Sequence, residues 1–142
     1  MPNCPAPPTT PLRVTVTPAT RLQPLHLLVR GELRRVTAAA VVARLPRLIA
    51  ERELRIVSRA LGLAATDLEV REAPESRGPG NAVWVRIASD HVTEVFTAFG
   101  EKGVPAEAVA EAAAREARHY LAAGVPVGEH LADQLLLPLA LA

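Results

Sequence analysis

Alternating apolar and polar residues, together with β-branched ones, mark five segments of the chain as strands. They are residues 12–17, 32–43, 67–72, 82–87 and 92–96. Because successive side chains of a strand point to opposite faces, Val83, Val85 and Ile87 are expected on one face. The segment 32–43 contains several alanines, so a helix remains an alternative there.

A second pattern, with apolar residues three or four positions apart, predicts helices. The first begins near Pro46, a residue suited to the first turn, and ends at Gly62. Its expected apolar face consists of Ala50, Leu54, Val57 and Leu61. On the exposed side, Glu51 and Arg55 have the i,i+4 spacing of an ion pair.

Two further helices are predicted in the second half of the chain. One runs from near Pro105 to about Leu121. Its expected buried residues are Val109, Ala113, Ala117 and either Tyr120 or Leu121. The last helix begins at Gly128, and Pro138 is expected to kink or end it.

The order of these elements predicts the fold class. From Glu32 onward it is strand, helix, strand, strand, strand, helix. This order is typical of a small α/β (α+β) domain of about four strands and two helices, and the first crossover is expected to be right-handed.

The composition narrows the class of protein. A chain of 142 residues is long enough for one ordinary domain. Since 49% of the residues are hydrophobic but only 3% are aromatic, the core must be built from Ala, Val and Leu. The formal net charge of +1 provides no general attraction to nucleic acid.

Neither a secretory signal nor a membrane span is recognisable in the sequence. The Pro-rich residues 1–11 lack the basic and apolar regions of a signal peptide and are expected to form a disordered leader. The longest apolar run, residues 135–142, is far shorter than the ~20 residues that cross a bilayer. Cys4 is the single cysteine, so no disulfide framework can form. These observations predict a cytoplasmic protein with no membrane partner.

The polar cluster at the start of the last predicted helix is the strongest candidate for a binding site. Glu129, His130, Asp133 and Gln134 fall within two turns, and His130 lies three residues before Asp133 and four before Gln134. Such a group can contact a nucleotide through charge and hydrogen bonds. An ordinary helix start, with acidic residues near the positive end of the helix dipole, explains the same residues. Similarly, His130 has the chemistry of a base or nucleophile but also suits a solvated helix surface.

A run of arginines makes the first half of the domain locally basic. They are Arg34, Arg35, Arg44, Arg47, Arg52 and Arg55. Arginine recognises phosphate, but the interleaved Glu32, Glu51 and Glu53 weaken the idea of a phosphate-binding surface.

The remaining aromatic and histidine residues have simple structural interpretations. Trp84 alternates with the apolar face of its strand, which is more typical of packing than of base stacking. His26, His91 and His119 are scattered without the spacing of metal ligands, so no metal site is predicted.

Six blocks of the chain resemble the RNA 3'-terminal phosphate cyclase family, in the same order. They are residues 49–53, 78–82, 91–103, 105–110, 119–124 and 128–138. The resemblance extends from about Leu12 to Ala142, and several blocks in register are far more specific than one motif.

The resemblance implies an ATP-dependent enzyme that converts the 3'-terminal phosphate of RNA into a 2',3'-cyclic phosphate. In this family the phosphate is first adenylated by an AMP that a histidine carries, which divides one difficult displacement into easier steps. A divalent metal, Mg or Mn, assists at the phosphates. The implied partners are RNA 3' ends and ATP, with no role for DNA.

The family's architecture implies domain boundaries, because a small α/β domain is inserted into a large domain of repeated α/β units. Residues 31–123 resemble the insert, residues 12–30 a strand and linker of the large domain, and residues 124–142 a large-domain helix. In that helix His130 stands where the family has a tyrosine or histidine beside the nucleotide. Asp133 and Gln134 match residues that contact it.

The resemblance also implies what this chain does not contain. The family's adenylated histidine belongs to a motif beyond residue 142, so no catalytic residue is assigned, and the metal- and phosphate-binding segments precede residue 12. We therefore expect a truncated cyclase that is inactive by itself. An autonomous module that binds RNA or a protein, and a gene remnant without function, remain as alternatives.

The apolar tail, Leu135 to Leu141, is expected to pack on the large domain or to self-associate.

Overall fold

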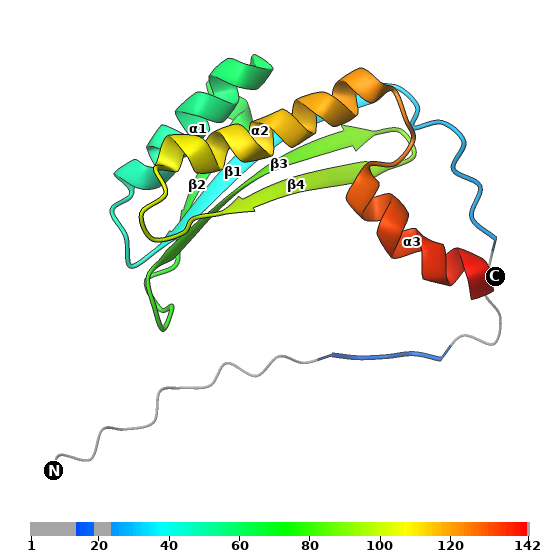
Figure 1. The fold of residues 1–142 in the computed structure, drawn as a ribbon, viewed down its shortest axis with the longest axis horizontal. Helices are drawn as coiled ribbons and strands as arrows, with labels where there is room; N and C mark the ends of the chain where they lie inside the picture. Colours follow the sequence, from blue (N-terminus) through cyan, green and yellow to red (C-terminus); the bar gives the residue numbers. More distant parts are fainter. Residues whose placement is uncertain (1–13, 19–23, 142) are drawn as a thin grey trace, which may run out of the picture.

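A four-stranded sheet with two helices on one face forms the body of the molecule (Figure 1). The structure, a computed structural model, describes residues 14–18 and 24–141. The strands are β1 (Leu33–Ala43), β2 (Leu68–Glu72), β3 (Gly80–Ser89) and β4 (Thr93–Phe99). The helices are α1 (Leu48–Leu61), α2 (Ala106–Ala123) and α3 (Glu129–Leu141), and a short 3-10 turn, η1 (Ala65–Asp67), precedes β2. The predicted small α/β class is confirmed.

The strand order in the sheet is β2-β1-β3-β4. β1 runs parallel to β2 and antiparallel to β3, and β4 is antiparallel to β3. The parallel pair requires a crossover, and α1 provides it. β1 has a partner on both sides, so the strand prediction for its alanine-rich segment is correct and the helix alternative is wrong.

The core lies between the sheet and the two helices α1 and α2. Val83, Val85 and Ile87 are buried on one face of β3, as their alternation predicts. Four alanines of α2 are also buried there: Ala110, Ala113, Ala114 and Ala117. Because these side chains are small, α2 can lie close to the sheet, and a core with few aromatic residues is still filled.

The end of α1 follows the sequence prediction closely. Gly62 adopts φ 67° and ψ 32°, a left-handed conformation that glycine tolerates without steric cost. Its N–H donates to the carbonyl of Ser58, which closes the last turn. The predicted ion pair between Glu51 and Arg55 is wrong, because Glu51 instead accepts from Arg47 at 3.0 Å, one turn earlier on the same helix.

Two predictions about the ends of the chain differ from the structure. Residues 14–18 belong to no strand, so the strand predicted over 12–17 is absent from the described part of this segment. An extended segment becomes a strand only when a neighbour takes its backbone hydrogen bonds, and no described strand pairs with it. Leu12, Arg13 and the predicted leader, residues 1–11, lie outside the described residues. At the other end, α3 continues through Pro138 to Leu141, so Pro138 does not end the helix.

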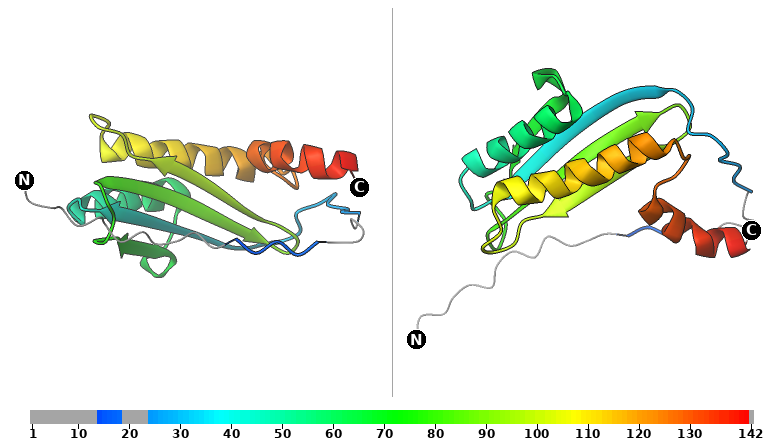
Figure 2. Two further views of the ribbon diagram at one scale, coloured as in Figure 1. Left: turned by 90° about the horizontal axis from the view of Figure 1, so that it is seen from below. Right: turned by 45° about the horizontal axis from the view of Figure 1, so that its top comes forward.

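α3 is set apart from the body. It leaves the molecule at the end where α2 finishes, and the incoming residues 24–30 lie at the same end (Figures 1 and 2). Its leucines are largely exposed, with Leu136 at 65% and Leu137 at 69%. Over the described residues, no helix is both long and apolar enough to cross a membrane.

Candidate functional site

The start of α3 is fixed to the body by one buried hydrogen bond. The Gly128 N–H, immediately before the helix, donates to Glu94 Oε1 on β4 at 2.6 Å. The Gly128 carbonyl accepts from Ala132 N at 2.9 Å and so begins the helix. Glu94 is only 5% exposed, and a carboxylate that binds a buried N–H makes a stronger hydrogen bond than a neutral acceptor. The start of α3 is therefore attached to the sheet through β4.

The three residues that the sequence predicts for nucleotide contact lie together on the first two turns of α3. His130, Asp133 and Gln134 are all exposed. The His130 Nε2 lies 3.6 Å from Glu116 Oε2 on α2, a contact that becomes an ion pair when the imidazole is protonated. Since neighbours three and four residues apart share one side of a helix, these side chains present one polar strip to solvent. The strip can form one wall of a ligand site.

Tyr120, near the end of α2, holds the two connections of the body together. The Arg30 guanidinium lies 5.3 Å from the centroid of the Tyr120 ring and donates to the carbonyls of Tyr120 and Leu121 at 3.3 Å each. The Tyr120 hydroxyl donates to the Pro126 carbonyl at 3.2 Å. Burial, followed by the nearby Glu94 charge, raises the pKa of Tyr120, so the phenol stays protonated at neutral pH. The incoming and outgoing segments are thus joined at one point.

Sequence reasoning missed the roles of Glu94 and Arg30. A signal for Glu94 was present, because it alternates with Phe96 and Ala98 and therefore faces the helices rather than solvent. Arg30 offered no comparable signal, since it lies in an irregular segment and its partners are 90 and 91 residues away.

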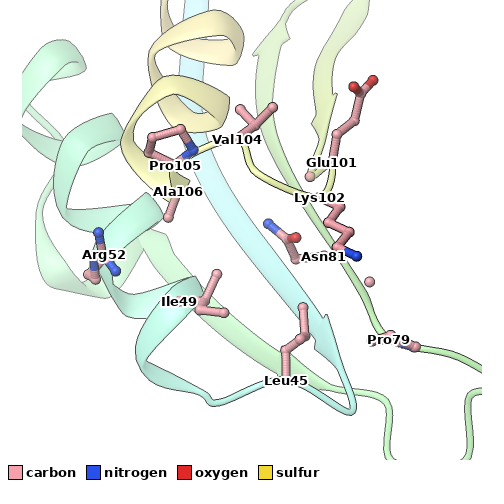
Figure 3. Close-up of a pocket in the computed structure, with 12 residues that line it drawn as sticks. Leu45, Ile49, Arg52, Pro79, Asn81, Glu101, Lys102, Val104, Pro105 and Ala106 are labelled. Carbon is pink, nitrogen blue, oxygen red and sulfur yellow. The ribbon is translucent and has the colours of Figure 1, made fainter.

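A cavity of about 440 Å³ lies at the opposite end of the body, where α1 and α2 begin (Figure 3). Its walls include Ile49, Asn81, Gly100 and Lys102. These residues come from three of the blocks that resemble the cyclase family, 49–53, 78–82 and 91–103. The fold therefore brings to one place blocks that are far apart in the sequence.

Glu53 lies behind this cavity wall as a fully buried carboxyl group. It is 0% exposed, and Asn81 Nδ2 donates to its Oε1, while Oε2 has no partner within the described residues. Burial raises the pKa of Glu53 to about 7, although the hydrogen bond from Asn81 opposes this. The Asn81 side chain occupies the space over Gly100, where any side chain at position 100 would clash with it. The residue pattern alone did not predict this buried acid.

The arginines of the first half are mostly engaged in ion pairs. Arg34 pairs with Asp90, Arg35 with Asp67, Arg47 with Glu51 and Glu72, and Arg52 with Glu107. Four of the six candidate phosphate-binding arginines are thus already neutralised by carboxylates. This weakens the hypothesis that they form a continuous RNA-binding surface.

No metal-ligand cluster is found in the parts of the chain that the structure describes. Within residues 14–18 and 24–141, no group of three or more His, Cys, Asp or Glu side chains is arranged to hold an ion. We therefore assign no metal-ligating role to any described residue.

Together, the fold and the site define a small α/β insert, entered and left at one end, with a polar strip on the helix that follows it. Residues 28–122 match the family model "RNA 3'-terminal phosphate cyclase (RTC), insert domain". The chain belongs to the RNA 3'-terminal phosphate cyclase family.

Relatives named RNA 3'-terminal phosphate cyclase align with most of this chain. The protein of Koribacter versatilis is 48% identical over 127 residues, which is 89% of this chain and 36% of the relative. That of Salmonella enteritidis is 50% identical over 127 residues, again 89% of this chain and 37% of the relative. That of Ralstonia nicotianae is 48% identical over 130 residues, or 90% and 37%. The chain spans little more than a third of the length of these curated relatives.

Proposed function

We propose that this chain provides the insert domain and one wall of the nucleotide pocket of an RNA 3'-terminal phosphate cyclase. The reaction is the ATP-dependent conversion of an RNA 3'-phosphate into a 2',3'-cyclic phosphate in the cytoplasm. Residues 31–123 are the insert, residues 12–30 and 124–142 belong to the large domain, and the leucines of α3 pack against large-domain elements. The observation that carries this proposal is the exposed polar strip of α3.

The strip has the chemistry that a nucleotide requires. Asp133 offers a charged hydrogen-bond acceptor, Gln134 both a donor and an acceptor, and His130 a ring that can lie beside the base. All three are open to solvent, so binding breaks no strong internal contact except the one between His130 and Glu116. ATP, when bound, supplies the AMP group that activates the RNA phosphate. The role of these three residues is to hold and orient it.

The same geometry leads us to propose that this chain alone does not form a covalent adenylate. The strip is exposed to solvent, and the hollow beside it, lined in part by His130, measures only about 100 Å³. A nucleotide needs a larger enclosing site. Incubation of the 142-residue chain with labelled ATP and Mg²⁺ should leave no stable protein-bound AMP, and a stable adduct would contradict this.

A chimera provides the direct test of the proposed function. The aligned segment of the Ralstonia nicotianae cyclase is replaced by the corresponding residues of this chain, and cyclisation of a 3'-phosphorylated RNA oligonucleotide is measured. We expect activity in the chimera, and a loss of about tenfold or more when Asp133→Ala or Gln134→Ala removes a hydrogen bond to the nucleotide. Glu111→Ala, an exposed acid on α2, is the matched control and should leave the rate unchanged. A folded chimera in which the α3 substitutions have no effect would refute the assigned site.

A further inference from the structure

The sheet has a second face that neither α1 nor α2 covers, and the only tryptophan of the chain lies on it. Trp84 is in β3, one residue from the buried Val83 and Val85, so its side chain points away from the helices. It is half-buried and lies opposite Ala39 on one side and Thr97 on the other. The sequence interpretation of Trp84 as a packing residue is therefore incomplete, because Trp84 is not part of the core between sheet and helices.

The indole ring is held in position by its neighbours. The Arg71 guanidinium lies 5.4 Å from the ring centroid, and two hydrogen bonds of 2.8 Å to Glu69 fix that guanidinium. Ala39, on the strand between them, is only 5% exposed, since these larger side chains surround it. An aromatic ring that is fixed before a ligand arrives loses little conformational freedom on binding.

The surroundings of the ring are positively charged. Arg86 lies two residues further along β3 on the same face, about 7 Å away by strand geometry, and is exposed. Within the described residues, Arg86 has no ion-pair partner. A hollow of about 240 Å³ is lined by Trp84, Arg86, Arg71 and Arg35.

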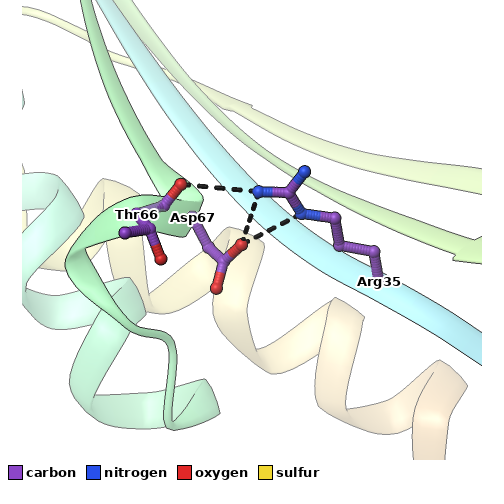
Figure 4. Close-up of polar contacts among 3 residues, drawn as sticks. All are labelled: Arg35, Thr66 and Asp67. Atoms are coloured by element: carbon purple, nitrogen blue, oxygen red, sulfur yellow. Dashed lines mark hydrogen bonds and ion pairs between the residues drawn. The ribbon is translucent and has the colours of Figure 1, made fainter.

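Arg35 forms the far wall of this hollow. Its Nε and a terminal nitrogen donate to Asp67 Oδ1 at 3.0 and 2.8 Å, and the same terminal nitrogen reaches the Thr66 carbonyl at 3.5 Å (Figure 4). Three arginines and two acids, Asp67 and Glu69, therefore line the hollow, and the surplus positive charge is that of Arg86. A hollow with a fixed aromatic ring and a spare cation favours an anionic ligand with a flat ring.

A second aromatic residue extends the same face. Phe99 on the edge strand β4 is 72% exposed and lies opposite Ala82, which precedes Trp84 by two residues on β3. Phe99 and Trp84 are thus diagonal neighbours, a distance that aromatic side chains can bridge. Val95, on the same face opposite Arg86, is 50% exposed.

We propose that this open sheet face binds a single-stranded segment of RNA, with one base stacked near Trp84 and its phosphate at Arg86. RNA as the ligand rests on the proposed function, whereas the site itself is separate from the α3 strip. Aromatic platforms beside a basic strand are the general means of holding unpaired nucleotides, because every base has a face that stacks and every nucleotide a phosphate. The spacing of a ring and a cation by two strand residues fits one nucleotide. The face would hold the RNA at a distance from its reacting 3' end.

The single tryptophan provides a direct test with the 142-residue chain. A fluorescently labelled, unstructured RNA of about ten nucleotides is titrated with protein, and both its anisotropy and the Trp84 emission are recorded. We expect saturable binding that quenches Trp84, weakens as salt is raised, and is not competed by duplex RNA. No binding, binding that leaves Trp84 emission unchanged, or equal competition by duplex RNA would each overturn the proposal.

Substitutions locate the bound RNA by label anisotropy. Trp84→Ala should weaken binding about tenfold or more, and Trp84→Phe, which keeps a stacking ring and a folded sheet, should weaken it less. Arg86→Ala should weaken binding. It should also reduce the slope of log affinity against log salt concentration by about one, the value of one phosphate contact. Arg115→Ala, an exposed arginine on α2, removes the same charge and should have no effect. Binding that is insensitive to Trp84 and Arg86, or equally sensitive to Arg115, would refute the site.

The two proposals fail separately. If Asp133→Ala does not change the activity of the chimera but the 142-residue chain still binds RNA through Trp84, only the nucleotide site on α3 is refuted. Absence of Trp84-dependent RNA binding, with the chimera active, would refute only the sheet site. A protein that binds this face in place of RNA would also count against the proposal.

Discussion

The body of the molecule buries a carboxylic acid, whereas α3 exposes leucines to water. Glu53 is 0% exposed, and Leu136 and Leu137 are 65% and 69% exposed. Side-chain polarity alone predicts the reverse. The two helices differ in what they pack against. The inner face of α1 packs on the sheet, so every side chain on that face is buried, including Glu53. Within the described residues, no helix or strand covers the leucines of α3. Burial of each leucine would contribute roughly 1.5–3 kcal/mol, and within the described residues α3 does not gain this contribution.

The largest effect is expected from Tyr120, where body and α3 connection meet. Tyr120→Ala removes a buried ring that packs 5.5 Å from Phe96 and should lower the free energy of unfolding by about 3–5 kcal/mol in urea titrations. Tyr120→Phe loses only the hydrogen bond to the Pro126 carbonyl and should cost about 1 kcal/mol. Equal losses in the two variants would show that the hydroxyl, not the ring, is the essential contact.

The buried acid gives the next largest effect and makes it depend on pH. Because the pKa of Glu53 is raised from 4.5 to about 7, the folded chain binds a proton that the unfolded chain has released over this interval. The free energy of unfolding therefore falls as pH rises from about 4.5 to 7 and stays low above that. Glu53→Gln cannot ionise and should remove this slope, with a gain on the order of 2–3 kcal/mol at pH 8.

Glu51→Gln on the exposed side of the same helix is the control for that experiment. It should retain the slope of the unmodified chain between about pH 4.5 and pH 7, because Glu51 is exposed. If Glu53→Gln shows the same slope as the control, Glu53 is not the group that titrates.

A smaller and local effect is expected at the junction with α3. Glu94→Ala leaves the buried Gly128 N–H without its acceptor, at a cost of about 1–3 kcal/mol, and frees the start of α3. Amide hydrogen exchange at Gly128 and proteolysis of residues 124–128 should both become faster. Glu94→Gln, which keeps an acceptor oxygen, should show much less of either change. Unaltered exchange in Glu94→Ala would mean that α3 is not held through this bond.

The smallest effect on stability is expected in α3 itself. Replacing Leu136 and Leu137 together by Gln should change the free energy of unfolding by less than about 0.5 kcal/mol, since both are already exposed. We expect the unmodified chain to self-associate through this helix in sedimentation experiments and the double variant to be monomeric. Val95→Gln on the open sheet face is the control and should leave association unchanged. A monomeric unmodified chain would contradict the self-association.

The helices were predictable where local rules decide the structure. The positive φ of Gly62 and the spacing of Ala50, Leu54 and Val57 need no information from elsewhere in the chain. Glu53 was not predictable, although it lies on the same helix face, because a charged residue is assigned to solvent unless its partner is known. That partner, Asn81, is 28 residues away and is brought close only by the sheet.

The candidate site divides in the same way. The start of α3 and the exposed positions of His130, Asp133 and Gln134 followed from the pattern around Gly128. The attachment of that helix to Glu94 did not, because it joins residues 34 apart on different elements. The face on which Trp84 lies could not be predicted without the strand order. Alternation identifies the two faces of a strand but does not show which one the helices cover.

The contact between Arg30 and the end of α2 means that ninety residues of folded chain begin and finish at the same place. The two ends of the folded unit lie so close that one side chain, Arg30, reaches from the incoming segment to the end of α2. For a host domain, the whole module is then equivalent to one tight turn between two of its own elements. Such a unit can be gained, lost or exchanged in evolution without moving the strands on either side of it.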